Sequence, residues 1–140
     1  MRLKNSGVYA VDVAGLGGTH WGRVEGLRAP ESDPLRIAAQ VFADWGHGTL
    51  QSLLAGGELQ TDYKLWASGG VRSGLDAAKL LAVGAEQVGI AQPLLQAALH
   101  GEENLLAAMT QFEMELKTAM FCTGCENLDQ FRRKKVYQWI

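Results

Sequence analysis

The sequence predicts an α/β fold with a parallel sheet, because three short apolar runs alternate with segments of helical periodicity along its 140 residues. Each run is largely apolar at consecutive positions, which is typical of strands that are buried on both faces. Each run also ends in glycine or another small residue, as a strand does where a loop begins. A chain of this length suits one domain, but it is too short for a closed eight-stranded α/β barrel, which needs about 250 residues.

Each expected element has its own boundary signals. Ser32 and Asp33 are candidate caps of the first helix after the first strand, and Thr49 is the candidate cap of the next helix. Gly84 closes a later helix, and Pro93 begins the one after it. We therefore expect strands at residues 8–13, 63–68 and 87–91, and helices at residues 34–44, 49–54, 74–83, 93–99 and 102–120.

Two of these helices carry an apolar stripe that we expect to face the core. The stripe of the helix at 74–83 consists of Leu75, Ala78, Leu81 and Ala82, and that of the helix at 102–120 consists of Leu105, Leu106, Met109, Phe112, Leu116 and Met120.

Parallel strands with helices between them bring the carboxyl ends of all strands to one edge of the sheet, and a ligand is expected at that edge.

Charge and hydropathy exclude some functions. The chain has 13 Lys and Arg against 15 Asp and Glu, a formal charge of -2, so it offers no broad attraction for nucleic acid or an acidic membrane. The basic cluster at residues 132–135 is short and isolated, and we interpret it as a solvated helix face rather than a nucleic-acid tail. No stretch approaches the ~18 apolar residues of a transmembrane helix, and no signal pattern opens the chain, so we expect a cytoplasmic protein.

Cys122 and Cys125 form a Cys-x-x-Cys motif. This spacing suits a redox pair or half of a zinc site. There is no second cysteine pair, however, and the three histidines, His20, His47 and His100, are scattered along the chain. We therefore interpret the cysteines as two reduced thiols at a helix end, and we expect no metal ligands in this chain.

The segment Ser68-Gly69-Gly70-Val71-Arg72 has the features of a phosphate-binding loop. Glycines let the backbone come close to an anion, successive N–H groups can form a nest for it, and the guanidinium of Arg72 matches phosphate oxygens. The helix that begins near Gly74 would direct its N-terminus to the same place. The alternative is a tight turn at the two glycines, with Arg72 and Asp76 forming an ordinary surface ion pair.

The loop after the first strand, Gly15-Leu16-Gly17-Gly18-Thr19-His20-Trp21, is a second candidate region. Its glycines would clear space beside a flat ligand, Thr19 can form a hydrogen bond, and Trp21 can cover an apolar or cationic group. If a helix begins here, Glu25 projects to the same side as Trp21 and could relay a proton as a buried carboxyl; a surface glutamate is the alternative. His20 and His47 each stand alone, and we interpret both as polar loop residues.

Several groups of residues share their order and spacing with one enzyme family: 11–21 with 24–25, 45–49 with 52–53, 67–79, 84–85, 89–93 and 115–120. Together they resemble the type 2 isopentenyl-diphosphate isomerases, which are FMN-dependent enzymes with an α/β barrel fold. The glycine-arginine motif alone occurs in many flavin barrels, but the whole set is specific. The resemblance extends over residues 5–133. It implies that residues 1–140 are the C-terminal part of a TIM (β/α)8 barrel, with strands six to eight and their helices.

The resemblance implies an activity and a site. The activity is the interconversion of isopentenyl diphosphate and dimethylallyl diphosphate at a reduced flavin, with NADPH as the reductant and Mg²⁺ bound outside this chain. Thr19 is implied as an FMN contact, Glu25 as a proton-transfer residue and Trp21 as an active-site aromatic residue. The implied phosphate loops consist of Gly69, Gly70, Val71 and Arg72, and of Ala91 and Gln92.

The chain departs from the family pattern in three residues and in length. Ala14 replaces a serine that touches FMN, His20 replaces an asparagine or serine, and Gly48 replaces a proline. The earlier strands have no counterpart here; in the family they supply the diphosphate contacts, the Mg²⁺-binding glutamate, a flavin-contacting lysine and a glutamine implicated in protonation. We expect either a fragment of a longer chain or a homo-oligomer. The alternatives in function are another FMN-dependent barrel oxidoreductase and a truncated, non-catalytic remnant that binds FMN or phosphate.

Overall fold

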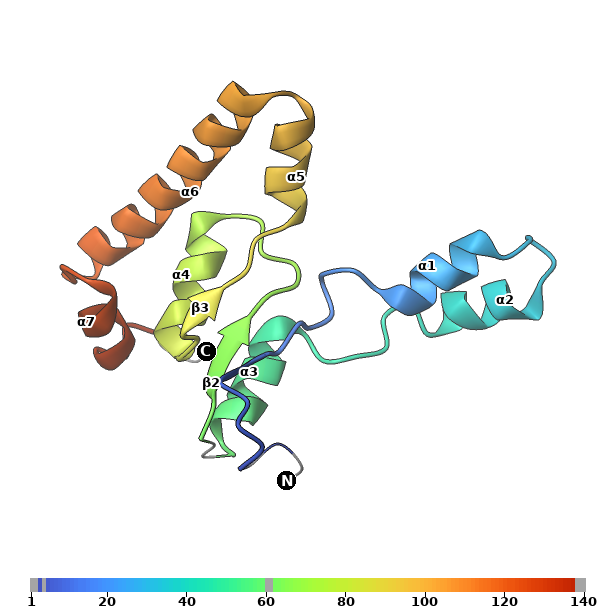
Figure 1. Ribbon diagram of the computed structural model, residues 1–140, viewed down its shortest axis with the longest axis horizontal. Coiled ribbons are helices and arrows are strands. Elements are labelled where there is room, and N and C mark those ends of the chain that lie inside the picture. The colour runs from blue at the N-terminus through green and yellow to red at the C-terminus, as the bar shows by residue number, and fades with distance from the viewer. Residues whose placement is uncertain (1–2, 4, 60–61, 138–140) are drawn as a thin grey trace.

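The protein is an α/β structure built on one parallel sheet, as predicted (Figure 1). The computed structural model describes residues 3, 5–59 and 62–137. The strands are β1 (Ala10–Asp12), β2 (Lys64–Ala67) and β3 (Gln87–Val88), and they lie side by side in the order of the sequence. Sequential order of parallel strands is the arrangement found in α/β barrels.

The helices connect and follow these strands, and all the expected ones are present. None of the helices among the described residues combines the length and the apolarity that crossing a membrane requires. The helices are α1 (Trp21–Arg28), α2 (Pro34–Val41), α3 (Thr49–Gly57), α4 (Gly74–Val83), α5 (Gln92–Leu99), α6 (Glu102–Cys122) and α7 (Leu128–Arg133).

The strands are shorter than the apolar runs that predicted them. Hydrogen bonds nevertheless continue past the regular ladder: the N–H of Val13 donates to the carbonyl of Trp66, and the N–H of Gly89 donates to that of Ala67. The runs at 8–13, 63–68 and 87–91 therefore locate the sheet correctly. They overestimate its regular part, because the backbone turns into the loops while its hydrogen bonds to the next strand persist.

The caps were predicted in part. Asp33 caps α2, since its side chain accepts a hydrogen bond from the N–H of Leu35. The prediction for Thr49 is wrong, because Gly48 occupies the N-cap of α3 and the side chain of Gln51 accepts from its N–H at 3.1 Å. Thr49 is the first helical residue instead, and its hydroxyl serves another purpose.

The core lies between one face of the sheet and the helices. Ala67 of β2 is fully buried against Leu53 of α3 and against Ala77 and Leu80 of α4. The other face of the sheet carries Asp12, whose carboxylate accepts a hydrogen bond from the hydroxyl of Ser68 at 2.7 Å. Helices α3 and α4 pack on the first face, as helices do on the outside of a barrel wall.

Helix α4 is buried on two sides and ties the sheet to the C-terminal helices. Ala78, Leu81 and Ala82 face away from the sheet and pack with Cys125 and Phe131. Figure 1 shows α4 between the strands and the pair formed by α6 and α7. The small alanine side chains let both layers come close to this helix.

Three residues of the predicted apolar stripes are exposed instead. Leu75, Leu106 and Met109 expose 51%, 55% and 51% of their surface. The covered stripe of α6 passes through Leu105 and Phe112, so Leu106 and Met109 lie just beyond its border. Helical periodicity identifies a face, but only the neighbouring elements determine how wide the covered part is.

The basic cluster near the C-terminus was also predicted incompletely. Arg132 is not solvated: its guanidinium donates to the carbonyl of Glu86 at 2.6 Å and pairs with Asp129. Lys134 donates to the carbonyls of Thr123 and Gly124, in the turn that follows α6. Two of the four basic side chains therefore hold α7 against the rest of the fold.

We expect Gly74→Ala to destabilise the protein by about 3 kcal/mol, because the added methyl group would overpack a helix crossing. A Cβ atom at Gly74 would lie 2.3 Å from the carbonyl oxygen of Phe112 and 2.9 Å from the backbone nitrogen of Leu116. Gly57→Ala is the matched control, since a Cβ there meets nothing within 4 Å. Chemical denaturation of both variants would test this, and equal stabilities would contradict it.

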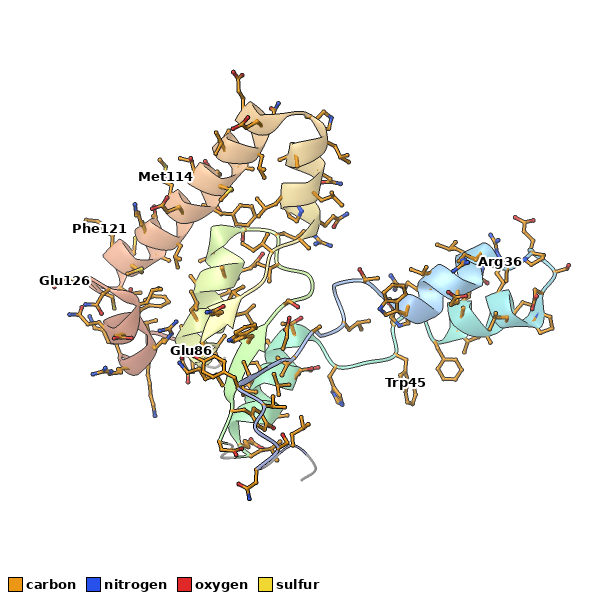
Figure 2. All side chains as sticks on the ribbon, in the orientation of Figure 1. Arg36, Trp45, Glu86, Met114, Phe121 and Glu126 are labelled. Atoms are coloured by element: carbon orange, nitrogen blue, oxygen red, sulfur yellow. The ribbon has the colours of Figure 1, made fainter. Side chains whose placement is uncertain are left out.

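We also expect stability to depend on the ion pair between Lys64 of β2 and Glu86, the residue before β3, which is labelled in Figure 2. Their 2.7 Å hydrogen bond lowers the pKa of Glu86 below 4.5 and, with a contribution from Tyr9, raises the pKa of Lys64 above 10.5. The stabilisation is therefore complete between these values, and it is lost as pH falls below about 4.5 or rises above about 10.5.

Lys64→Met should accordingly lower the Tm at pH 7 and have a smaller effect at pH 3, where Glu86 becomes protonated. Lys117→Met is the control, because Lys117 forms a comparable pair with Glu113 within one turn of α6 and holds no strands together. A Lys64→Met effect that is the same at both pH values would rule out the ion pair as its cause.

Candidate functional site

Three loops meet at the carboxyl edge of the sheet. The N–H of Gly15, after β1, donates to the carbonyl of Ser68, after β2, at 3.3 Å. The N–H of Leu16 donates to the carbonyl of His47 at 2.8 Å, just before α3. Gly89, after β3, lies so close to Ser68 that a Cβ on Gly89 would be 2.9 Å from the Cβ of Ser68. The loops after all three strands are therefore contiguous, as the sequence predicted.

The glycines of these loops make room for the backbone of neighbouring loops. A Cβ on Gly15 would lie 2.3 Å from the nitrogen of Thr49, and one on Gly18 would lie 2.7 Å from the Cα of Gly69. A Cβ on Gly70 would lie 3.0 Å from Gly17. These glycines let the loops touch one another, and the space beside a flat ligand stays a prediction.

The loop after β2 presents free N–H groups. Gly69 and Gly70 have φ values of +93° and +81°, which glycine adopts without strain. Among the residues that the structure describes, no acceptor contacts the N–H groups of Gly69, Gly70 and Val71. Consecutive unpaired N–H groups in such a turn form a concave site for an anion. The loop thus has the donors that a phosphate group requires.

Arg72 lies at the end of this loop with an exposed guanidinium. Its Nη2 is 3.5 Å from the carbonyl of Gly17, a long contact that leaves most of its donors free. The alternative of an ion pair with Asp76 is not found in the described part of the chain. Asp76 instead accepts a hydrogen bond from the backbone N–H of Arg72 at 3.2 Å and approaches Lys79 at 4.0 Å.

The N-terminus of α4 contributes less to an anion site than the sequence suggested. Glu115 of α6 accepts a hydrogen bond from the N–H of Gly74 at 2.5 Å, and the hydroxyl of Ser73 accepts from the N–H of Asp76 at 3.1 Å. Gln111 in turn donates to Glu115. Protein groups thus occupy these helix donors, so the loop from Gly69 to Val71 offers the free ones.

The second predicted phosphate segment lies at the start of α5. Ala91 occupies the N-cap of this helix without a side-chain cap. Among the described residues, the N–H groups of Ala91 and Gln92 have no acceptor. A short loop and a helix N-terminus therefore add two more free donors at the same edge of the sheet.

A helix does begin at Trp21, but the side chains of Trp21 and Glu25 are not buried. Trp21 is 72% exposed, and Glu25 exposes 54% of its side chain and pairs with Arg28 at 3.2 Å. The expectation of a buried carboxyl at Glu25 is wrong for this chain. Trp21 and Thr19 border a shallow depression of about 350 Å³, whose wall consists of Ala14, Gly15, Leu16, Gly18, Thr19, His20, Trp21, Trp45, Gly46, His47 and Ser52.

His20 has a structural role that the sequence did not reveal. Its Nδ1 accepts a hydrogen bond from the N–H of Arg23 at 3.1 Å and caps α1. The α1–α2 hairpin extends away from the sheet, and Trp45 lies on the segment that returns from it (Figures 1 and 2). Gly26 of α1 contacts Ala39 of α2 without room for a Cβ, so the two helices form a tightly packed pair.

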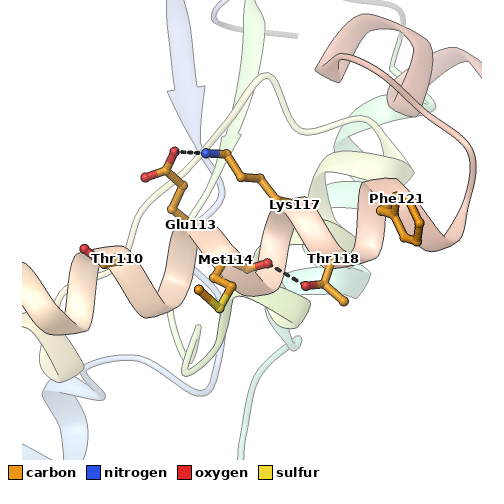
Figure 3. Close-up of a pocket in the computed structure, with 6 residues that line it drawn as sticks. All are labelled: Thr110, Glu113, Met114, Lys117, Thr118 and Phe121. Carbon is orange, nitrogen blue, oxygen red and sulfur yellow. Dashed lines mark hydrogen bonds and ion pairs between the residues drawn. The ribbon is translucent and has the colours of Figure 1, made fainter.

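Another depression, of about 340 Å³, lies on the outer side of α6 and is separate from this edge (Figure 3). Figure 3 shows that its wall comes from successive turns of one helix. Lys117 pairs there with Glu113, and Thr118 donates to the carbonyl of Met114. These local pairs satisfy the polar groups without converging donors, so the depression has no features of a ligand site.

Cys122 and Cys125 are free thiols near the end of the same helix, as interpreted from the sequence.

Residues 8–138 match the family model described as FMN-dependent dehydrogenase. The structure also resembles that of a mutant of flavocytochrome b2 with benzoylformate, with a TM-score of 0.57 and 23% sequence identity. The superposition covers 65% of this chain and 25% of that protein's chain. At this identity the superposition supports the fold alone, which is that of part of an α/β barrel.

Several curated relatives carry the description isopentenyl-diphosphate delta-isomerase. The relative from Bdellovibrio bacteriovorus is 56% identical over 98% of this chain and 40% of its own length. Those from Legionella pneumophila (strain Corby) and Methanothermobacter thermautotrophicus are 54% and 43% identical, over 96% and 97% of this chain and 39% and 38% of their own lengths. The chain therefore spans about 40% of the length of the relatives it matches.

Proposed function

This chain belongs to the FMN-dependent dehydrogenase family, and we propose that it is the FMN-phosphate-binding part of an isopentenyl-diphosphate isomerase. The observation that carries the proposal is the loop after β2, where the N–H groups of Gly69, Gly70 and Val71 are free beside the guanidinium of Arg72. Identities of 43–56% with isopentenyl-diphosphate delta-isomerases support this reaction over others of the family.

The residues present fit the phosphate end of FMN. Three consecutive free N–H groups and one planar guanidinium match the oxygens of a phosphate dianion. Ala91 and Gln92 would donate from the neighbouring loop, and Thr19 would contact the cofactor from the loop after β1. In this proposal Trp21 covers an apolar part of the site and Glu25 moves a proton, which requires that α1 become covered.

The proposed reaction is a proton addition and removal with no net oxidation. When bound, the reduced flavin supplies the proton chemistry, and NADPH keeps it reduced. The three strands correspond in this proposal to strands six to eight of a (β/α)8 barrel, over residues 1–140. The diphosphate and Mg²⁺ would be bound by residues outside this chain, in a longer protein or a homo-oligomer within the cytoplasm.

Two other functions remain distinct alternatives. The chain can be part of another FMN-dependent barrel oxidoreductase, which the family membership alone would equally support. It can also be a non-catalytic module that binds FMN or phosphate without turnover. The first alternative predicts oxidation of a substrate, and the second predicts binding without any reaction.

Arg72→Ala should weaken FMN binding by about 10- to 100-fold, the effect of losing a charge-assisted pair of hydrogen bonds. Riboflavin, which lacks the phosphate, should bind the wild-type and variant chains equally weakly. Quenching of flavin fluorescence measures both affinities. Arg133→Ala is the matched control, because Arg133 is an exposed arginine of α7. Undiminished FMN affinity in Arg72→Ala would remove the guanidinium from the site.

The isomerase proposal itself is tested in a chimera. We expect the chain alone to show no isomer exchange with isopentenyl diphosphate, Mg²⁺, FMN and NADPH, because the strands that hold the diphosphate are absent. The chimera that carries this chain in place of the matching part of the Bdellovibrio bacteriovorus relative should catalyse exchange. A chimera that binds FMN but forms no product would favour the non-catalytic module.

A further inference from the structure

Thr49 is the buried polar side chain nearest the candidate phosphate loop. It is 8% exposed. Its hydroxyl lies 2.6 Å from the carbonyl oxygen of Gly69 and 3.0 Å from that of Ser68. A hydroxyl has one proton to donate, so the two carbonyl groups share it. The first residue of α3 thus holds two consecutive peptide groups of the loop after β2.

Peptide geometry connects these carbonyl groups to the free donors. In a trans peptide the C=O and N–H bonds are fixed in one plane and point in opposite directions. The carbonyl of Ser68 belongs to the same peptide group as the N–H of Gly69, and the carbonyl of Gly69 belongs to that of Gly70. A hydroxyl that draws both carbonyls toward itself therefore turns both N–H groups away from itself, on the side where neither has an acceptor.

The backbone of Thr49 is itself held in place by the loop after β1. Gly15 packs directly on its backbone, so that a Cβ there would lie 2.5 Å from the Cα of Thr49. The N–H of Gly15 also donates to the carbonyl of Ser68, and the hydroxyl of Ser68 donates to Asp12 at 2.7 Å. The carbonyl of Ser68 therefore accepts from both Thr49 and Gly15, whereas among the described residues that of Gly69 accepts from Thr49 alone.

We infer that Thr49 is a positioning residue for phosphate recognition, which orients the N–H groups of Gly69 and Gly70 before any ligand arrives. This inference rests on the proposed FMN-phosphate site. In this inference a single hydroxyl, on the far side of the loop from the phosphate, sets the direction of both N–H groups. The residue does not touch the phosphate.

The test compares Thr49→Val, which removes the hydroxyl at nearly constant shape, with Thr49→Ser, which retains it. Without any flavin, ¹⁵N relaxation should give order parameters of about 0.85 for the Gly69 and Gly70 amides in the wild-type chain and Thr49→Ser. In Thr49→Val the order parameter of the Gly70 amide should fall below about 0.6, and that of the Gly69 amide should fall less, because Gly15 still donates to its peptide group. Thr49→Ala carries the same test if circular dichroism shows that Thr49→Val is unfolded.

Flavin binding gives a second measurement. The ratio of FMN affinity to riboflavin affinity isolates the contribution of the phosphate. Loss of the hydrogen bond that orients the donors should reduce this ratio about fivefold to tenfold in Thr49→Val, and Thr49→Ser should restore most of it. Riboflavin affinity itself should not change.

Thr123 provides the matched control. Its hydroxyl also contacts two carbonyl groups, those of Ala119 and Met120 at 2.8 and 3.0 Å, but at the end of α6. Thr123→Val removes the same chemical group elsewhere in the fold. It should leave the order parameters of Gly69 and Gly70, and the ratio of FMN affinity to riboflavin affinity, at their wild-type values.

The outcomes separate this inference from the proposed function. Wild-type order parameters at Gly69 and Gly70 in Thr49→Val would overturn the role of Thr49 and leave the phosphate site standing. A wild-type chain that binds FMN no more tightly than riboflavin would overturn the phosphate site, and with it the recognition role of Thr49. An equal loss of flavin ratio in Thr49→Val and Thr49→Ser would also overturn the inference, because the hydroxyl would then not be the cause.

Discussion

The fold depends on how closely α4 can pack against the layers on its two sides. Ala77 contacts the sheet, Ala78 contacts the C-terminal helices, and Gly74 leaves space for the backbone of α6. Larger side chains at these positions would separate the layers, since a close-packed interior tolerates little added volume. Because α4 begins directly after the loop that follows β2, its packing also places Val71 and Arg72 relative to the sheet.

Periodicity and capping signals predict most of this fold, because they reflect local geometry. The bounds of α4 are as expected, since Ser73 and Gly84 mark its two ends. The regular strands are shorter than expected, and Leu75 and Leu106 are exposed, because strand ends and the width of a buried stripe are set by neighbouring elements. A single sequence contains no direct measure of those neighbours.

In the candidate site, too, the sequence predicts the features that depend on local residues and misses those that depend on distant ones. The loop after β2 and Arg72 are recognisable from the sequence, because glycines after a strand and before a helix form a local pattern. Thr49 and Glu115 are not, since their partners lie 20 and 41 residues away. The glycines were also interpreted as space for a ligand, whereas those of the first loop face backbone. The glycines indicate that some group comes close to the backbone of this loop, but the residue type does not say whether that group is a ligand or another loop.

The α1–α2 hairpin lies within the connection between β1 and β2, and its contact at Gly26 and Ala39 is internal to the hairpin. Closing a longer connection costs little, about 0.6 kcal/mol for each doubling of length. The register of Ala10 with Lys64 therefore places weak constraints on the hairpin. The turn between α1 and α2 can therefore change in length without disturbing the contacts between the loops at the sheet edge.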